Sequence, residues 1–332
     1  MTAKQDDADE REGSRSPEEE ILIGVSACLL GAKVRYDGQH KLDLYVTGVL
    51  GRFVRFVPVC PEVDIGLGTP RETIRLAEKE GEVRLVAPKS GADHTEAMLG
   101  YAAAKCQALA GLNLSGYILK KDSPTCGMER VRVYPASGVP SRSGRGLFAQ
   151  ALMENLPLLP VEEEGRLNDP WLRENFVERV FAYVRLRRLF SAPWKVGDLV
   201  AFHTREKLLL LAHEPKGYAV LGRLVASAKD HPRSAVAMEY QLRFMGAMAK
   251  IATVKKHVNV LQHMAGYFKR AATAEDRHEL EQAVEDYRRG AAPLVVPVTL
   301  LRHFVRRYAV PYLAGQTYLE PSPKELLLRN HV

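Results

Sequence analysis

Short apolar runs alternate with helical patterns through the first half of the chain. Residues 21–26, 54–59 and 116–120 are apolar runs of the kind that form buried strands, and 156–161 predicts one more short strand. Residues 93–112 have the pattern of an alanine-rich amphipathic helix. Strands separated by helices predict βαβ units, and therefore an α/β domain with a mainly parallel sheet and flanking helices.

The second half of the chain is helical in pattern almost throughout. Its first helix follows Asn168-Asp169-Pro170, a good helix-start signal. The predicted helices are 170–191, 197–213, 216–228, 235–251, 253–271, 274–289 and 296–309. We therefore expect an α/β domain over 21–165 and an all-α domain over 170–332. The boundary lies between residues 165 and 195, and the first helix could belong to either side.

Composition is that of a globular protein without an export signal. The 332 residues suggest two domains, and 46% hydrophobic with 26% charged residues are typical of a soluble chain. No apolar run approaches the ~20 residues that span a bilayer. Residues 1–20 are acidic and lack an apolar stretch, so they predict a disordered tail and no secretory signal. We therefore expect a cytoplasmic protein with reduced thiols, which favours metal or catalytic roles for cysteine.

The net charge of +7 is unevenly distributed. Residues 1–170 hold 21 Lys and Arg against 25 Asp and Glu, whereas residues 171–332 hold 26 against 15. A basic C-terminal half indicates contact with a polyanion, and a basic surface that only maintains solubility is the alternative. Residues 137–146 predict a flexible basic loop that contains Arg142 and Arg145.

Three of the four cysteines stand at the ends of predicted strands. Cys28, Cys60 and Cys126 each lie beside turn-forming residues, whereas Cys106 lies in the predicted helix 93–112. Loops that leave neighbouring parallel strands converge on one crevice. The spacings of 32 and 66 residues lack the close pair of a structural zinc site. Three thiolates with one open position fit an iron–sulfur cluster better, and three simply buried cysteines are the alternative.

Two of these cysteines have neighbours suited to proton transfer. Glu62 lies two residues after Cys60, and Ser123 lies three residues before Cys126. A carboxylate and a hydroxyl near a Lewis-acidic centre can move protons and orient water. The alternative is that Glu62 is a helix-start charge and Ser123 a capping or turn residue.

Residues 20–160 resemble the thiouracil desulfidase family. The motifs that carry the resemblance are Ser26-Ala27-Cys28-Leu29-Leu30-Gly31, Val34-Arg35-Tyr36-Asp37-Gly38, Cys60-Pro61-Glu62, Pro70-Arg71-Glu72 and Ser123-Pro124-Thr125-Cys126-Gly127. The resemblance implies that Cys28, Cys60 and Cys126 hold a [4Fe–4S] cluster whose fourth iron is open to the substrate's sulfur. It also implies catalytic roles for Glu62 and Ser123. Thr125 stands where many relatives have serine, and Cys106 matches no motif position.

Other polar residues of these motifs are candidates for the mouth of the site. We expect Ser26, Asp37 and Arg71 to contribute to substrate binding. Asp37 is more simply a turn residue, and Arg71 could instead pair with Glu72 on the surface.

The second half resembles an uncharacterised helical domain that is often fused to the desulfidase domain. The matching stretches lie within 202–207, 256–268 and 316–321. Proteins with this fusion resemble tRNA 4-thiouridine desulfidases, which return the modified base to uridine. The basic half is compatible with such a partner, because tRNA is a dense polyanion. The residues expected to contact tRNA are Arg142, Arg145, Lys255, Lys256, His257, Lys269 and Arg270.

Two other functions remain open from the sequence. The protein could act on free thiopyrimidines, with the helical domain serving dimerisation. It could also be a non-catalytic RNA-binding or redox-sensing protein with a structural cluster, although Glu62 and Ser123 beside the cysteines argue against this.

Overall fold

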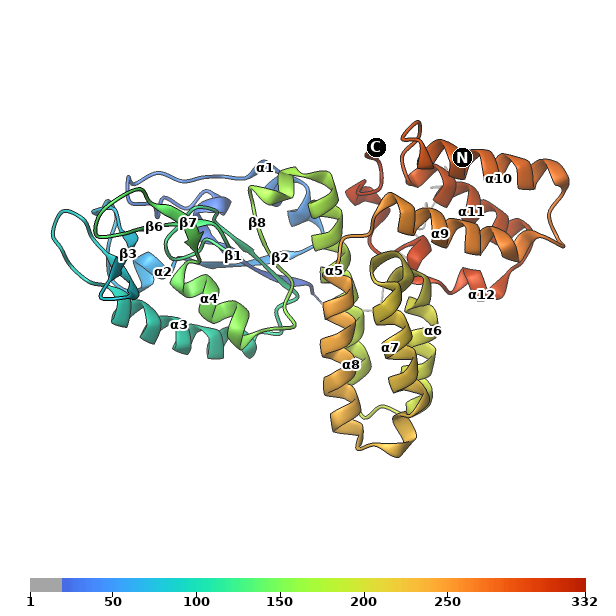
Figure 1. Ribbon diagram of the computed structural model, residues 1–332, viewed down its shortest axis with the longest axis horizontal. Coiled ribbons are helices and arrows are strands. Elements are labelled where there is room, and N and C mark those ends of the chain that lie inside the picture. The colour runs from blue at the N-terminus through green and yellow to red at the C-terminus, as the bar shows by residue number, and fades with distance from the viewer. Residues whose placement is uncertain (1–19) are drawn as a thin grey trace, which may run out of the picture.

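The computed structural model describes residues 20–332 and consists of an α/β region followed by a helical region (Figure 1). The two regions lie side by side along the long axis of the molecule, with α5 (Pro170–Phe190) between them. The predicted acidic tail lies outside the described residues, apart from Glu20. None of the described helices is both long and apolar enough to cross a membrane.

A four-stranded sheet, sheet A, forms the centre of the α/β region. Its strand order is β2–β1–β5–β8, and each neighbouring pair is parallel. Its strands are β1 (Leu22–Ser26), β2 (Arg55–Val59), β5 (Gly116–Leu119) and β8 (Val161–Glu163). The predicted α/β fold is therefore confirmed. The last strand begins at Val161 rather than at 156, because a turn occupies the residues before it.

Helices cover both faces of sheet A. Helices α3 (Thr95–Ala110) and α4 (Leu147–Asn155) pack on the face to which Tyr117 and Leu119 point. Helices α1 (Leu44–Gly48) and α5 pack on the other face, with Ile118. Alternate residues of a strand face opposite sides, so a sheet buried on both faces needs consecutive apolar residues. Cys106 lies on α3 within the first of these cores and is 1% exposed.

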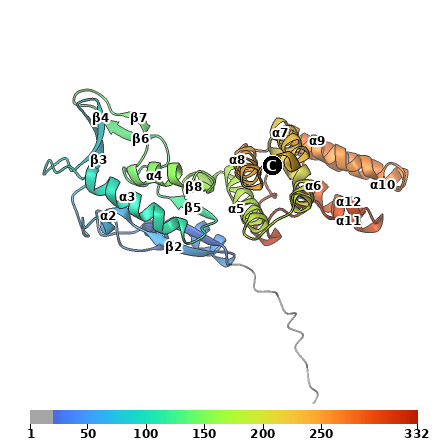
Figure 2. The same cartoon turned by 90° about the horizontal axis from the view of Figure 1, so that it is seen from below.

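A second sheet, sheet B, lies at the end of the α/β region farthest from the helices (Figure 2). Its strand order is β4–β3–β6–β7, where only the β3–β6 pair is parallel. The strands are β3 (Arg75–Lys79), β4 (Glu82–Val86), β6 (Val131–Tyr134) and β7 (Ser141–Gly144). The sequence analysis did not predict this sheet, and β7 corrects the flexible loop expected over 137–146. Its short strands carry charged residues on one face, so they lack the apolar runs that identified sheet A.

The helical region is built as the sequence pattern predicts. Helix α5 is capped by Asp169, whose side chain accepts the backbone N–H of Trp171 at 2.9 Å and of Leu172 at 3.1 Å. Phe202, Tyr240 and other apolar residues of the region form one core. The helices that follow α5 are α6 (Val196–His213), α7 (Pro215–Ala226), α8 (Arg233–Met248), α9 (Val254–Ala265), α10 (Ala274–Arg288), α11 (Val295–Arg307) and α12 (Pro311–Ala314).

Helix α5 and the C-terminal segment both connect the two regions. Phe176 of α5 belongs to the core under sheet A, whereas Leu186 of the same helix belongs to the helical core. Leu326 and Leu328 come back from the helical region and pack in the core under sheet A. The helical region is therefore attached to the α/β region at both of its ends.

Candidate active site

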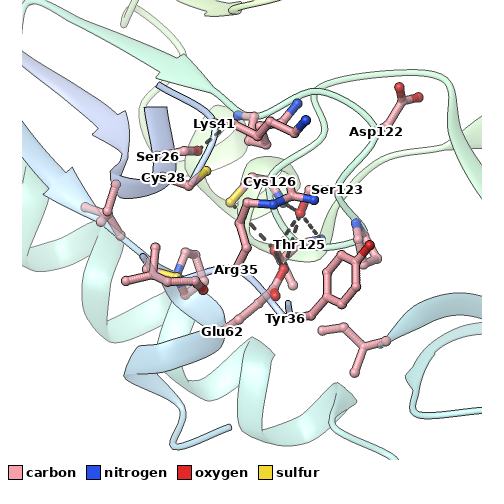
Figure 3. Close-up of a pocket in the computed structure, with 18 of the residues that line it drawn as sticks. Ser26, Cys28, Arg35, Tyr36, Lys41, Glu62, Asp122, Ser123, Thr125 and Cys126 are labelled. Atoms are coloured by element: carbon pink, nitrogen blue, oxygen red, sulfur yellow. Dashed lines mark hydrogen bonds between the residues drawn. The ribbon is translucent and has the colours of Figure 1, made fainter. Parts of the chain in front are cut away.

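One cavity at the carboxyl ends of β1, β2 and β5 brings three cysteines together. Its volume is about 400 Å³, and Cys28, Cys60 and Cys126 line it. All four cysteines of the chain are free thiols. Cys28 and Cys126 are 8% and 6% exposed, and their sulfur atoms face the same space (Figure 3). The loops after three adjacent parallel strands thus converge, and Cys106 does not line this cavity.

Cys28 and Cys60 are placed by the first residues after their strands. Cys28 lies in the 3₁₀ turn Ala27–Leu30, directly after β1. Cys60 follows β2 and immediately precedes α2 (Pro61–Asp64), so the short helix carries Glu62 beside it. Because β1 and β2 are parallel neighbours, the two cysteines leave the sheet at the same edge.

The loop that contains Cys126 is held by the beginning of α4. The first-turn N–H groups of Leu147 and Ala149 donate to Pro124 O at 3.2 Å and to Thr125 O at 3.1 Å. These N–H groups have no partner within their own helix, so they are available to fix the loop. Gly146 packs so closely that an added Cβ would lie 2.5 Å from Thr125 O, and the contact therefore requires glycine.

Burial raises the pKa of all three thiols. Desolvation brings the pKa of Cys28 to about 11, although the charge of Lys120 opposes it. Desolvation and the charge of Glu62 bring the pKa of Cys126 to about 12, and burial also raises the pKa of Cys60. The hydrogen bonds at these sulfurs are long: 3.8 Å from Cys60 Sγ to Val34 O, and 3.6 Å from Thr125 Oγ1 to Cys126 Sγ. The sulfurs are therefore soft buried donors without strong partners.

This set of donors fits a metal cluster better than a single ion. Within residues 20–332, no three Cys, His, Asp or Glu side chains are close enough to bind one metal ion. In an iron–sulfur cluster each thiolate binds a different iron, so the sulfurs stand farther apart around a common centre. Three thiols around a cavity of about 400 Å³ meet that requirement.

Glu62 is hydrogen-bonded to two hydroxyl groups of the Cys126 loop. Its Oε1 accepts from Thr125 Oγ1 at 2.8 Å and from Ser123 Oγ at 3.4 Å, and the two hydroxyl oxygens are 2.9 Å apart. Ser123 Oγ also accepts the backbone N–H groups of Thr125 and Cys126, at 3.2 and 3.1 Å. Its lone pairs are thus used, and its own proton can point to Thr125. The order Ser123, Thr125, Glu62 forms a path along which a proton can move.

Thr125 is the residue of this path that the sequence analysis missed. It is fully buried and its hydroxyl is closer to Glu62 than that of Ser123. Ser123 closes the turn with its backbone bonds and also contacts Glu62, so its catalytic role stays a prediction. The position of Thr125 directly before a cysteine of the cavity was the available signal.

Arg71 lines the cavity, but most of its N–H donors are bonded to Glu62 and to backbone carbonyls. Its Nε donates to Glu62 Oε2 at 3.2 Å, and its Nη2 bonds to the same oxygen. Its Nη1 donates to Val34 O at 3.0 Å and to Gly68 O at 2.8 Å. The side chain is 5% exposed. The structure therefore favours a role in positioning Glu62 over the predicted contact with substrate.

The other two residues expected to bind substrate differ in their placement. Ser26 lines the cavity, and its Oγ accepts the backbone N–H of Lys120 at 3.0 Å, which ties the ends of β1 and β5 together. Asp37 does not line the cavity. It is exposed and accepts the backbone N–H of Gln39 at 3.1 Å, so it is a turn residue and the predicted substrate contact is corrected.

The residues predicted to contact tRNA divide into exposed and buried groups. His257 is 1% exposed, and its Nδ1 lies 2.9 Å from the Tyr318 hydroxyl. Burial, with the nearby charge of Arg329, lowers the pKa of His257 to about 3, so the ring is neutral and the predicted phosphate contact is wrong. Lys256 is half-buried and donates to His213 O at 2.5 Å. The exposed members are Arg142, Arg145, Lys255, Lys269 and Arg270.

Two sequence families match separate parts of the chain. The family described as 2-thiouracil desulfurase matches residues 23–164, which include the three cysteines of the cavity, Glu62 and Ser123. A family described as protein of unknown function (DUF1722) matches residues 207–323 in the helical region.

Two curated proteins and one solved structure are also similar to parts of this chain. The uncharacterized protein YbgA of Escherichia coli (strain K12) is 33% identical over 153 residues, which are 46% of this chain and 90% of YbgA. The uncharacterized protein YbbK of Bacillus subtilis (strain 168) is 34% identical over 111 residues, which are 32% of this chain and 73% of YbbK. A solved structure, described as the [4Fe-4S]-dependent thiouracil desulfidase TudS, has 34% sequence identity and a TM-score of 0.37, covering 46% of this chain and 95% of its own. The chain belongs to the 2-thiouracil desulfurase family and carries a DUF1722 region behind its desulfidase region.

Proposed function

We propose that this protein is an iron–sulfur-dependent desulfidase that converts 4-thiouridine in tRNA to uridine. The observation that carries the proposal is the convergence of Cys28, Cys60 and Cys126 on a cavity that also holds Glu62. The similar solved protein is described as [4Fe-4S]-dependent, and the three thiols here fit a group of that kind. When bound, such a cluster offers a soft, Lewis-acidic iron that no protein residue occupies, which favours sulfur over oxygen.

The reaction assigned to the site is a hydrolysis. One water molecule supplies the oxygen that replaces sulfur at C4, and the sulfur leaves as sulfide without net transfer of electrons. Glu62 is the base of this step, because its Oε1 lies in the cavity wall and its Oε2 is fixed by Arg71. Thr125 and Ser123 bond to Glu62 Oε1 and supply the path by which the proton returns to the substrate.

The cavity requires the base to leave the folded RNA. Cys28 and Cys126 are almost completely buried, so a base stacked in a helix cannot bring its sulfur to them. The mouth of the cavity suits a nucleotide that has been extruded. Tyr36 is 43% exposed there and offers a ring for stacking, and the exposed Lys41 offers positive charge to the adjoining phosphates (Figure 3). The exposed Lys121 lines the same cavity and adds a second positive charge.

Charge supports tRNA over a free base. Residues 171–332 carry 26 Lys and Arg against 15 Asp and Glu, and tRNA is the substrate that would use such an excess. Lys255, Lys269 and Arg270 are exposed at the beginning and after the end of α9 and can reach a phosphate backbone. Free thiouracil remains the rival substrate, because the matching family and the similar solved protein are named for it.

Mass analysis of tRNA nucleosides tests the proposal. Protein loaded with its cluster under anaerobic conditions is incubated with tRNA that contains 4-thiouridine, and the nucleosides and released sulfide are quantified. We expect 4-thiouridine to be lost in equal amount to the uridine and sulfide formed. The Cys106→Ala variant should retain this turnover and Cys126→Ala should lose it. Turnover of free thiouracil with intact 4-thiouridine in tRNA would replace the proposed substrate by the free base.

A further inference from the structure

Three arginines form a row across the outer face of sheet B. Leu76 on β3 pairs with Val133 on β6, and both are buried in the core. The parallel register therefore places Arg75 beside Arg132 on the opposite, outer face. On the other side of β6, Val133 pairs with Ser141, so the next residue, Arg142, lies beside the same row.

These arginines line one groove next to the active site. Arg75, Arg132 and Arg142 line a cavity of about 340 Å³ together with Tyr134. Ile74, Asp122 and Pro124 line both this groove and the cavity that contains the three cysteines. The groove therefore adjoins the active-site cavity, with these three residues forming the border between them.

The three arginines of the groove carry more positive charge than the nearby carboxylates neutralise. Arg142 Nη1 lies 3.4 Å from Asp122 Oδ1, and both side chains are about half exposed, which makes a weak ion pair. The guanidinium of Arg75 lies 4.6 Å from the centre of the Tyr134 ring. Within residues 20–332, Arg75 and Arg132 have no ion pair with a carboxylate. Like charges on neighbouring strands destabilise a sheet, so this arrangement indicates an anionic ligand.

We propose that this arginine groove binds the sugar–phosphate backbone beside the thiolated nucleotide while its base occupies the cysteine cavity. This inference rests on the proposed function, because a free base has no phosphate. Guanidinium groups bind phosphate through paired N–H donors, and a row across three strands spans roughly 10 Å, enough to follow a bent backbone. Sheet B, which carries these arginines, lies at the end of the molecule away from the helical region (Figure 2), so we assign the groove to the reacting nucleotide and not to RNA bound at the helical region.

Variants of the three arginines test the groove with two substrates. We would prepare Arg75→Ala, Arg132→Ala, Arg142→Ala and the triple variant, with Arg52→Ala as the control of equal charge for the single variants. Arg52 is exposed before β2, at the other end of sheet A from the cavity. Cluster-loaded protein is assayed on thiolated tRNA and on free 4-thiouracil, and the Kd for tRNA is measured by anisotropy at several salt concentrations.

We expect the variants to lose binding and turnover of tRNA while they keep turnover of the free base. Each alanine variant should weaken tRNA binding and kcat/KM on tRNA by roughly 3- to 10-fold and lower the salt slope of binding by about 1. Turnover of 4-thiouracil should not change, and Arg132→Lys should recover part of the loss. Equal Kd values for the triple variant and Arg52→Ala would overturn the groove. Absence of tRNA turnover by the unaltered protein would instead overturn the proposed substrate, whatever the groove binds.

Discussion

The cysteine cavity of the α/β region and the Glu178–Arg329 network of the helical region both bury ionisable residues, but they differ in the space left beside those residues. In the α/β region, three thiols and Glu62 face a cavity of about 400 Å³, within the range of ligand sites. In the helical region, Glu178 and Arg329 bond to each other at 2.7 Å beside a cavity of about 80 Å³. Buried polar residues indicate a functional site where their side chains converge on an open cavity. They indicate a structural role where they bond to one another.

The helical network is closed by its own partners. His213 Nε2 lies 3.0 Å from Glu178 Oε2, and Arg329 also donates to Tyr318 O at 2.7 Å. Burial opposes the ionisation of Glu178, but the charge of Arg329 and the bond to His213 outweigh it and lower the pKa of Glu178 to about 2. Arg329 and His213 thus hold the Glu178 carboxylate from within the protein.

The largest effect is expected from the cysteines. Cys28→Ala, Cys60→Ala or Cys126→Ala should each remove the visible absorbance of the reconstituted cluster and most of its iron, because each variant deletes one of the three thiolates proposed to hold it. Iron analysis and absorbance of anaerobically reconstituted protein measure this. Cys106→Ala is the matched control, since Cys106 is buried in the α3 core outside the cavity, and it should keep about four irons. A colourless protein that binds zinc instead would contradict the assignment.

The next effect is expected from the proton path. Glu62→Gln should keep the cluster and reduce kcat by about 10²- to 10⁴-fold, as loss of a general base does. Thr125→Val should reduce kcat by roughly tenfold, because Ser123 still reaches Glu62 Oε1 at 3.4 Å. Thr125→Ser should restore activity, since it keeps the hydroxyl. An equal loss in Thr125→Val and Thr125→Ser would show that Thr125 only fills space.

Removing one partner of the helical network should affect stability and leave the chemistry intact. Arg329→Met leaves Glu178 buried without its partner and should cost about 3–5 kcal/mol in the free energy of unfolding. Denaturant unfolding followed by circular dichroism measures this. The exposed pair of Arg288 and Glu285 supplies the control, and Arg288→Met should change the midpoint little. If Arg329→Met unfolds as the original protein does, the network is not what stabilises the helices.

The last effect is expected from acid, and it is absent at neutral pH, where the other variants are compared. The pKa of His257 is lowered to about 3, mainly by burial, and that of His203 to about 4 for the same reason, so both rings are neutral in the fold. In the unfolded chain both histidine rings bind a proton below the usual histidine pKa of about 6.5. The stability that these neutral rings contribute should therefore be fully present above about pH 6.5. Below it the free energy of unfolding should fall towards pH 4, by up to about 1.4 kcal/mol per histidine and pH unit. His257→Gln should flatten the slope of unfolding free energy against pH, and the exposed His278→Gln should not.

Sheet A and the long helices could be predicted from the sequence because their apolar residues follow simple periods. The three cysteines could be placed together because strand ends in a parallel sheet share one edge. Sheet B could not, since residues such as Arg75 and Arg132 interrupt its strands with charge. The burial of His257 depends on Tyr318, which lies 61 residues later in the chain. Thr125 was overlooked because only the folded loop shows which hydroxyl faces Glu62.

The attachment of the helical region at both of its ends has a mechanical consequence. A region joined by one linker can swing, but here α5 leaves the core under sheet A and Leu326 and Leu328 return to it (Figure 1). A cut at residue 165 would remove Phe176, Leu326 and Leu328 from that core, so the desulfidase half cannot be isolated there without exposing apolar surface. The two regions should instead move as one body. Any long substrate that touches both regions must match the fixed distance between them. The protein would therefore select its substrate by shape in addition to catalysing its reaction.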